Sequence, residues 1–394
     1  MYYTINRSTV HQHAAGILHG CLRLKDFSPT CTARILLHVL FAASARLCSL
    51  SAACWSLVAA PCRETIRKAL LRSLAGRDEL LRRLNRALVA DVPRGLRKRP
   101  QQVSIDLTLI PYHGQPMFDL KEVYRSQAKS GTSHFHAYAT AYVNYRGQRF
   151  TLALTVVERG EKMEEVLKRL LRRLGQLGIS VRMLLLDRGF WSVAAIRYLQ
   201  AARKPFLMPV ILRGRGEDHP EGPGGTRIFA TRKKGGWDEY TLTSANGTTA
   251  RVSICVHCRN YDGQWGRHGR QTLVYAYWKM RPTNTRWVRE TYRKRFAIET
   301  SYRQLHQCRA RTCTRNPLVR LLLVGIALVL RNVWVWLHYA VLSTPRRGGR
   351  RLNLDKLTLE TMLLWLLHQA EEVLGVDDAV EAEHPMLHDL TTCI

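Results

Sequence analysis

Apolar and polar residues alternate along the chain from Val103 to Leu109. A period of two predicts a β-strand, and it places Asp106 on the polar side of that strand. The same alternation returns in residues 134–143 and 148–157, on either side of a short segment that contains Asn144 and Gly147. Because Asn and Gly favour tight turns, these runs predict a hairpin and, with the first strand, three neighbouring strands.

A helical period follows between Glu161 and Leu177. Its apolar residues form one stripe and Gly178 stands just after its end, as is common at helix C-termini. The unbroken apolar run before Asp187 predicts a strand buried on both faces. Strand, helix and strand in this order predict a right-handed parallel crossover, in which ligands collect at the carboxyl ends of the strands. Asp187 lies at such an end.

A helix from about Ser192 and a strand within residues 206–212 complete the expected core, a mixed α/β sheet of roughly five strands flanked by helices. A stretch rich in Gly and Pro, residues 214–225, then indicates a hinge into an insertion. Three alternating runs predict that this insertion is a small antiparallel sheet. They lie near residues 237–244, 249–258 and 271–280.

The helical period returns at Arg286 and continues through His306. An apolar helix is expected over residues 318–342, a basic loop over 345–351 and a last helix over 357–374. These patterns divide the chain into five regions. The regions are a helical basic region (1–99), the first part of the core (100–212), a β-rich insertion (213–286), the last part of the core (287–342), and a basic loop with a C-terminal helix (343–394).

Helical spacing in residues 32–50 and 51–57, followed by a helix beginning near Pro61, predicts a short helix, a turn and a basic helix in the N-terminal region. This order is typical of a helix-turn-helix, although an ordinary helical hairpin explains it equally well. The basic residues expected to meet DNA in the first case are Arg63, Arg67 and Lys68.

The chain carries 61 Lys and Arg residues against 30 Asp and Glu residues, a formal net charge of +31. Such an excess repels itself unless a polyanion neutralises it. Nucleic acid is the expected partner, because Lys and Arg gain affinity by displacing the cations condensed on the phosphate backbone. The apolar and charged content is otherwise that of a soluble globular protein.

Ten cysteines are spread unevenly along the chain, which favours free thiols in a reducing compartment over a disulfide framework. Cys255 and Cys258 have zinc-ligand spacing but lie in a strand-like run, so buried thiols are favoured over a structural zinc. The apolar helix at residues 318–342 is interrupted by Arg320 and Arg331. The stretch between them is too short to cross a bilayer, so we expect a buried core helix and no membrane association.

Three acidic residues stand out in this arrangement: Asp106 in mid-strand, Asp187 at a strand end and Glu299 on a returning helix. Cleavage of a phosphodiester can be catalysed by two Mg²⁺ ions about 3.5–4 Å apart, and such hard cations prefer carboxylate oxygens. Each acid alone also fits an ordinary role, as a helix cap or in a surface ion pair. The helical period places further polar residues on the face of Glu299. They are Tyr292, Arg295, Arg303 and His306.

The order of these motifs resembles that of the DDE-type insertion-sequence transposases, over roughly residues 100–340. The resemblance rests on an aspartate in the first strand, on an Asp-Arg-Gly-Phe sequence at residues 187–190, and on a Tyr-x-x-Arg-x-x-x-Glu sequence at residues 292–299. The family has an RNase H-like core that is interrupted by a β-rich insertion before the last acidic residue. The resemblance therefore implies an RNase H-like fold for this chain.

The resemblance also implies roles for individual residues. Asp106, Asp187 and Glu299 would be catalytic and hold two Mg²⁺ ions, with Mn²⁺ as a substitute. Contacts with DNA near the cleaved end would come from Arg188, Tyr292, Arg295, Arg303 and His306. The partners would be the terminal repeats and the target DNA, bound by a homodimer in the nucleoid of a prokaryotic cytoplasm.

One position departs from the family pattern. A lysine follows the glutamate by seven residues in the family, whereas this chain has His306 there, with Arg303 and Arg309 nearby. A histidine is mostly neutral at physiological pH unless a phosphate raises its pKa. The family also holds a flipped base with an aromatic residue, for which Trp191 and Trp265 are the candidates, although core packing explains either tryptophan as well.

The sequence thus predicts a DNA transposase that cleaves the ends of its element and joins the freed 3′-hydroxyl to target DNA. Two alternatives stay open. One is a transposase-derived DNA-binding protein that no longer catalyses, and the other is a metal-dependent nuclease or resolvase that cleaves without joining. The sequence offers no serine-hydrolase elbow and no paired Cys and His nucleophile arrangement.

Overall fold

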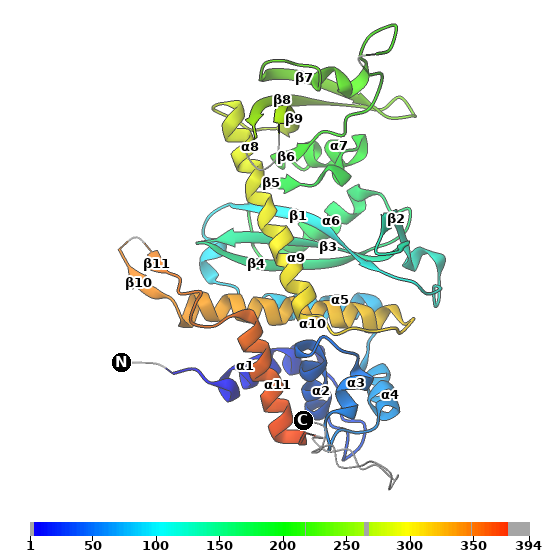
Figure 1. Ribbon diagram of the computed structural model, residues 1–394, viewed down its shortest axis with the longest axis vertical. Helices are drawn as coiled ribbons and strands as arrows, with labels where there is room; N and C mark the ends of the chain where they lie inside the picture. The colour runs from blue at the N-terminus through cyan, green and yellow to red at the C-terminus, as the bar shows by residue number, and fades with distance from the viewer. Residues whose placement is uncertain (1–3, 217, 264–267, 348, 377–394) are drawn as a thin grey trace, which may run out of the picture. The chain divides into compact units, whose positions relative to one another are not determined.

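The computed structural model describes residues 4–216, 218–263, 268–347 and 349–376 (Figure 1). The chain forms two compact units. Unit 1 comprises Met1–Leu74, Cys308–Cys313 and Thr358–Ile394, and unit 2 comprises Ala75–Gln307 and Thr314–Leu357.

Unit 1 is built from helices. Side-chain oxygens of Asn6, Thr32 and Ser49 accept backbone N–H groups at the starts of the first three of them, which satisfies donors that have no partner within the helix. Helix α11, the last one within the described residues, packs against the first two, so segments far apart in the sequence share one core. The helices are α1 (Arg7–Leu22), α2 (Ala33–Ala45), α3 (Leu50–Trp55), α4 (Arg63–Ser73) and α11 (Leu359–Leu374).

Two histidines are buried side by side within unit 1. The rings of His11 and His38 stack with centroids 4.5 Å apart, and the exposed fractions of the two residues are 7% and 0%. No described residue forms a hydrogen bond with either ring nitrogen of His38 or with Nε2 of His11. Burial lowers the pKa of both histidines to about 4, with further contributions from Arg34 at His11 and from His11 and Arg34 at His38. Both are therefore neutral at physiological pH.

The centre of unit 2 is a mixed sheet, nine-stranded within the described residues (Figure 1). Its core has the order β4-β3-β1-β5-β6, in which β5 is parallel to β1, β6 is parallel to β5, and the other core pairings are antiparallel. Strand β2 pairs with the beginning of β3. The core strands are β1 (Gln101–Pro111), β2 (Tyr124–Lys129), β3 (Thr132–Tyr145), β4 (Gln148–Val157), β5 (Val181–Leu186) and β6 (Phe206–Pro209).

We had expected the insertion to form a small antiparallel sheet of its own. Its strands instead continue the core sheet. Its strands β7 (Gly236–Thr243), β8 (Thr249–Asp262) and β9 (His268–Trp278) are antiparallel to one another, and β9 pairs with β6. The physical reason is that the outer edge of β6 carries N–H and C=O groups that need partners. Pairing with β9 satisfies them and fixes the insertion beside the carboxyl end of β5.

Helices cover the sheet of unit 2. α5 and α10 pack against each other and against β4, whereas α6 packs against β4 and α7. Helix α5 therefore belongs to unit 2, although its sequence lies within the region 1–99 that we had set apart as N-terminal. The helices are α5 (Arg77–Leu88), α6 (Met163–Gln176), α7 (Val193–Ala201), α8 (Thr285–Arg293), α9 (Ala297–Cys308) and α10 (Pro317–Trp336).

The outer edge of β4 is satisfied by two side-chain amides. Asn85 on α5 accepts from the backbone N–H of Leu154 and donates to its carbonyl, at 2.8 and 2.9 Å. Asn332 on α10 forms the equivalent pair with Thr151, at 3.1 and 2.7 Å. An amide offers both a donor and an acceptor, as a neighbouring strand would. The two helices thus take the place of a further strand.

The region from Arg286 to His306 is not one continuous helix. A 3₁₀ turn, Lys294–Phe296, separates α8 from α9, and the single helical face predicted for Tyr292 through His306 is therefore interrupted. The basic segment after α10 also differs from the expected loop, because β10 (Thr344–Arg346) and β11 (Gly349–Arg351) pair as two short antiparallel strands.

Helix α10 and the π-helical turn after it are long and apolar enough to cross a membrane, the one such case in the described part of the chain, and 89% of the apolar window is buried. Two arginines interrupt the helix, and both have internal partners. Arg331 donates to the carbonyl of Arg149 at 2.7 Å and to Gln304 at 3.1 Å, and Arg320 donates to the carbonyl of Thr314 at 2.7 Å. The helix is buried in unit 2, as the sequence predicted.

The close packing of α10 on α5 gives a first prediction. A Cβ added at Gly325 would lie 2.8 Å from Cγ of Leu84 and closer still to both methyl carbons. We expect Gly325→Ala to reduce the free energy of unfolding by about 1–3 kcal/mol through overpacking, despite the ~1 kcal/mol by which alanine favours a helix over glycine. Denaturant unfolding followed by circular dichroism measures the difference.

Two further variants control this prediction. In a Leu84→Ala background the same Gly325→Ala change should be neutral or stabilising, because the obstructing carbons are gone. Gly175→Ala on α6, where no atom lies within 4 Å of the added Cβ, should also be neutral or stabilising. An equal loss of stability with Leu84 present and absent would contradict the packing explanation.

The buried histidines give a prediction for pH. Their pKa values in the folded chain lie below the value of about 6.5 expected after unfolding, so the unfolded chain binds more protons between about pH 4 and 6.5. Stability present at pH 7 is therefore lost as the pH falls through this range, by roughly 3 kcal/mol for each histidine. Unfolding of the chain at pH 7 and pH 4.5 should reveal this loss, and a His11→Phe/His38→Phe variant should show a clearly smaller one. An unchanged dependence on pH would refute the assignment.

Candidate active site

Two aspartates lie side by side because of the register between β1 and β5. The strands are parallel, and Ile105 is paired with Leu186. The next residue in each strand is an aspartate, Asp106 in β1 and Asp187 directly after β5. Asp187 precedes the short 3₁₀ turn Arg188–Phe190, and its side chain forms no capping hydrogen bond there. The ordinary role of a capping aspartate therefore does not account for it.

The 3₁₀ turn between α8 and α9 brings a third acidic residue and an arginine to the same place. Arg295 lies in the turn and Glu299 in the first turn of α9. The hydroxyl of Tyr142 on β3 lies 3.1 Å from the carbonyl of Lys294 and 3.4 Å from that of Arg295. The hydroxyl of Tyr302 on α9 donates to the backbone carbonyl of Asp106 at 2.8 Å. These two tyrosines fix the turn and helix over the sheet.

The guanidinium of Arg295 lies among all three carboxylates. Its Nη1 atom is 2.7 Å from Asp106, and its Nη2 atom is 3.7 Å from Asp187 and 3.5 Å from Glu299. The exposed fraction of the side chain is 8% for Arg295 and 12% for Asp106, and it rises to 36% for Asp187 and 50% for Glu299. The folded chain thus brings together the three acids that the sequence singled out, around a buried cation.

Burial dominates the electrostatics of Asp106. It raises the pKa of this carboxyl to about 6, with Arg295 opposing the rise and the negative charge of Asp187 adding to it. Burial disfavours the charged form of Arg295 too, but the neighbouring acids outweigh this effect and raise its pKa. The Asp106 carboxylate also accepts the backbone N–H of Leu107 at 2.8 Å. The guanidinium thus offsets the repulsion between carboxylates that the fold brings close together.

A cleft of ≈ 1180 Å³ opens beside the acids, between the end of β5 and the insertion. Asp187 and Glu299 lie in its wall, and the rest of the wall combines five arginines with uncharged polar and apolar residues. Its cationic members are Arg188, Arg259, Arg289, Arg293 and Arg295. Sequence reasoning missed Arg259, Arg289 and Arg293, because no motif separates them from the other basic residues of the chain.

The remaining predicted residues are distributed unevenly around the cleft. Tyr292 is buried, with its ring 5.4 Å from the guanidinium carbon of Arg295, whereas Arg188 is exposed in the cleft wall. Arg303 and His306 are exposed on α9, and neither is among the described residues that line the cleft.

The aromatic candidates differ from what we expected. Trp191 is half-buried and is not among the described residues lining the cleft, and Trp265 lies outside the described residues. Phe296, which sequence reasoning did not select, is 49% exposed and lies in the cleft wall beside Arg295. Its ring centroid lies 5.7 Å from the guanidinium carbon of Arg295.

The arrangement of the acids does not match a closed metal site. Within the described residues, no group of three or more His, Cys, Asp or Glu side chains is spaced to hold a metal ion. Cys255 and Cys258 also belong to no such group among the described residues. Both are free thiols, the first buried and the second half-buried. Burial raises the pKa of Cys255 to about 12, as expected for a packed thiol.

The three basic residues predicted to bind DNA in unit 1 are exposed on helix α4. Arg67 forms two hydrogen bonds with Glu64, at 2.8 and 2.6 Å, and Lys68 lies 4.0 Å from the same carboxylate. Arg63 is exposed in the first turn. Glu64 therefore offsets part of the positive charge on this helix.

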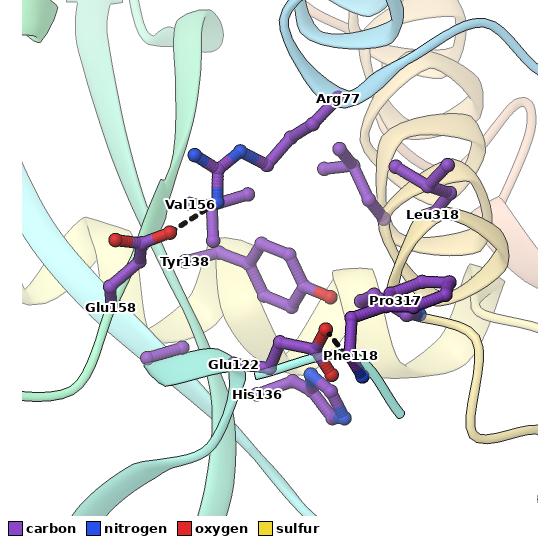
Figure 2. Close-up of a pocket in the computed structure, with 11 residues that line it drawn as sticks. Arg77, Phe118, Glu122, His136, Tyr138, Val156, Glu158, Pro317 and Leu318 are labelled. Atoms are coloured by element: carbon purple, nitrogen blue, oxygen red, sulfur yellow. Dashed lines mark hydrogen bonds and ion pairs between the residues drawn. The ribbon is translucent and has the colours of Figure 1, made fainter. Parts of the chain in front are cut away.

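A smaller and mostly apolar cavity of ≈ 230 Å³ lies elsewhere in unit 2 (Figure 2). Tyr138 and His136 project into it from β3, Phe118 and Leu318 close it from other elements, and an ion pair between Arg77 and Glu158 borders it. Burial lowers the pKa of His136 to about 4, so this cavity contains a neutral imidazole. The three converging acids are not part of it, and we do not assign the chemistry to this cavity.

Comparison with known proteins adds a family. Residues 97–332 match the family model described as "Transposase DDE domain". No curated protein sequence matches the chain. Among solved structures, the chain is similar to a piggyBac transposase in a synaptic complex with hairpin DNA, with a TM-score of 0.53 and 11% identity, covering 94% of this chain and 81% of that one. At this level of identity the similarity shows the fold alone.

The central position of Arg295 leads to a prediction. We expect Arg295→Gln to destabilise unit 2 by roughly 3–5 kcal/mol, because it leaves the buried Asp106 carboxylate without its counter-charge. In an Asp106→Asn background the same substitution should cost less by about 0.5–3 kcal/mol. Hydrogen exchange of peptides from β1 at neutral pH measures both costs, and equal costs in the two backgrounds would show that the two residues are not coupled.

Proposed function

The chain belongs to the family of transposases with a DDE domain, and from this premise we propose that it is a DNA transposase that cleaves the ends of its element and joins them to target DNA. The observation that carries the proposal is the convergence of Asp106, Asp187 and Glu299 around Arg295. Three acids that lie far apart in the sequence meet at one end of a buried sheet, beside a basic cleft.

The topology supports an RNase H-like core. The strand order β4-β3-β1-β5-β6, with an antiparallel meander followed by two strands parallel to β1, fits the core that the resemblance implied. In this arrangement the first strand is central and its aspartate lies beside the carboxyl end of β5. The insertion enters after β6 and returns through α8 to Glu299.

Transposases of this family generally use divalent metal ions. Carboxylate oxygens are the ligands that Mg²⁺ prefers, so the donor type fits two Mg²⁺ ions, or Mn²⁺ in their place, held by Asp106, Asp187 and Glu299. The present spacing does not fit, because the guanidinium of Arg295 lies among the acids and none of the described groups is spaced to hold an ion. We propose that these three residues would hold the metal, which would stabilise negative charge on the phosphodiester.

The residues of the chain itself have definite roles in this proposal. The five arginines of the cleft wall bind the phosphate backbone, and Arg188 and Arg293 are exposed there. Arg295 contacts a phosphate only after it leaves Asp106, so its present ion pairs neutralise the acids in the absence of DNA. Tyr292, whose hydroxyl has no hydrogen-bond partner among the described residues, holds Arg295 against its ring.

Further parts of the proposal concern partners and context. Unit 1 binds the terminal repeats through Arg63, Arg67 and Lys68 on α4, and a homodimer brings two ends together. Arg303 and His306 contact DNA outside the cleft, beside Glu299 on the exposed side of α9. The protein acts on double-stranded DNA in the cytoplasm of a prokaryotic cell.

The proposal is tested with Asp106→Asn, Asp187→Asn and Glu299→Gln, each examined separately. Each variant should bind DNA, yet its rate of Mg²⁺-dependent nicking should fall by about 100-fold or more, the scale set by loss of charge stabilisation in the transition state. The substrate is a plasmid that carries the DNA flanking the gene, including any inverted repeats. Gel separation of supercoiled, nicked and joined forms measures the products.

Glu290→Gln provides the matched control, because Glu290 is an exposed carboxylate on α8 that pairs with Arg286 at 2.8 Å and does not line the cleft. Its nicking rate should stay near that of the wild type. Full activity in any of the three acid variants would remove that residue from the site. Nicking without joined products would favour a nuclease or resolvase, and DNA binding without any nicking would favour a transposase-derived binding protein.

A further inference from the structure

A second polar cavity, of ≈ 600 Å³, lies in unit 2 beside the beginning of β1. Five cationic side chains line it, and none of its described lining residues is acidic. We call it the basic cavity. All five cations are exposed to solvent, and they come from four separate segments of the chain. They are Lys98, Arg99, Arg146, Arg182 and Lys294.

Some of the other cations on the surface of unit 2 form ion pairs. On the helices, basic residues such as Lys168 and Arg286 pair with carboxylates one turn away. No such ion pair connects any of the five cations of the basic cavity with an acidic residue in the described ranges. Like charges that face one cavity without counter-charges repel one another. An anion in the cavity would relieve this repulsion.

The basic cavity lies on the same face of the sheet as the acids. Ser104 lines the cavity and Asp106 binds Arg295, and successive odd or even residues of a strand face the same side. Their partners on β3 are Tyr142 and Thr140, of which Tyr142 also lines the cavity. Two residues of a strand span about 6.6 Å. The cavity thus begins within one side-chain length of the acids.

The 3₁₀ turn Lys294–Phe296 separates the two sites. Lys294 lines the basic cavity, whereas Arg295 and Phe296 line the cleft. The hydroxyl of Tyr142 lies within hydrogen-bonding distance of the carbonyls of Lys294 and Arg295. This contact fixes the turn to β3. An extended ligand that leaves the cleft across this turn meets the basic cavity next.

We propose that the basic cavity binds the phosphate backbone of the same DNA duplex that occupies the cleft, on the other side of the 3₁₀ turn. The inference rests on the proposed function. One strand of DNA advances about 3.4 Å per nucleotide along the helix axis, so the spacing of Ser104 and Asp106 corresponds to about two nucleotides. Five cations along a wall match a row of phosphates better than one small anion, because a single phosphate group can contact only some of them.

The binding is independent of sequence. The cavity is lined by side chains that contact phosphates as positive charges, and phosphate contacts position a duplex without reading its bases. The cavity therefore fixes the direction in which the DNA leaves the active site. Its loss weakens the binding of every duplex to a similar extent and leaves the three acids in place.

The experiment compares the salt dependence of DNA binding in Arg182→Gln/Lys294→Gln with that of the wild type. Fluorescence anisotropy of a labelled 30-bp duplex of arbitrary sequence, in EDTA, gives Kd between about 50 and 300 mM salt. The plot of log K against log salt has a negative slope, and each lost phosphate contact makes it less steep by about 0.9. The slope of the double variant should be less steep than that of the wild type by about 1.8. The double variant should also bind roughly 10- to 100-fold more weakly at 0.1 M salt.

Lys121→Gln/Arg172→Gln is the matched control, because it removes one lysine and one arginine that are exposed in unit 2 and line neither site. Its slope should equal that of the wild type. If the double variant does not fold, Arg146→Gln alone is a milder test. Its slope should be less steep than that of the wild type by about 0.9. Equal slopes in all variants, or an equal loss in the control, would overturn the inference. A wild-type chain that binds no duplex would instead overturn the proposed function.

Discussion

The ion pairs of Arg295 with Asp106, Asp187 and Glu299 are the interaction on which the architecture of this site depends. Asp106 is buried in the middle of a sheet, where a lone carboxylate is costly, and its pKa of about 6 reflects that burial. One guanidinium has five donors in a planar arrangement, and it can therefore serve several carboxylates at once. The 3₁₀ turn that carries Arg295 must lie directly over β1 for this to happen.

This requirement accounts for several features at a distance from the acids. The helix that was expected to run from Arg286 to His306 is interrupted at the turn, and Tyr142 and Tyr302 bind the turn and α9 to the sheet. The insertion enters after β6 and ends at α8, so the pairing of β9 with β6 determines where the turn begins. The edge pairing of the sheet and the position of the arginine are therefore parts of one constraint.

The distribution of charge follows from the same layout. The three acids lie on one face of the sheet, beside the 3₁₀ turn. Cations line the cleft on one side of this turn and the basic cavity on its other side. Ten of the 61 basic residues of the chain line these two sites, five in each. The cations of the two sites therefore lie beside the three carboxylates, on either side of the turn.

The sequence by itself determined the local elements, because alternation and helical spacing depend only on neighbouring residues. It gave β4 as residues 148–157, the crossover through α6, and the acidic residues Asp106, Asp187 and Glu299 from their positions in those elements. The tertiary structure alone decided which edges pair, and hence that the insertion extends the core sheet through β6 and that α5 belongs to unit 2. It also decided that Arg295 lies among the acids and that distant cations form two cavities, since such contacts join residues that no local pattern relates.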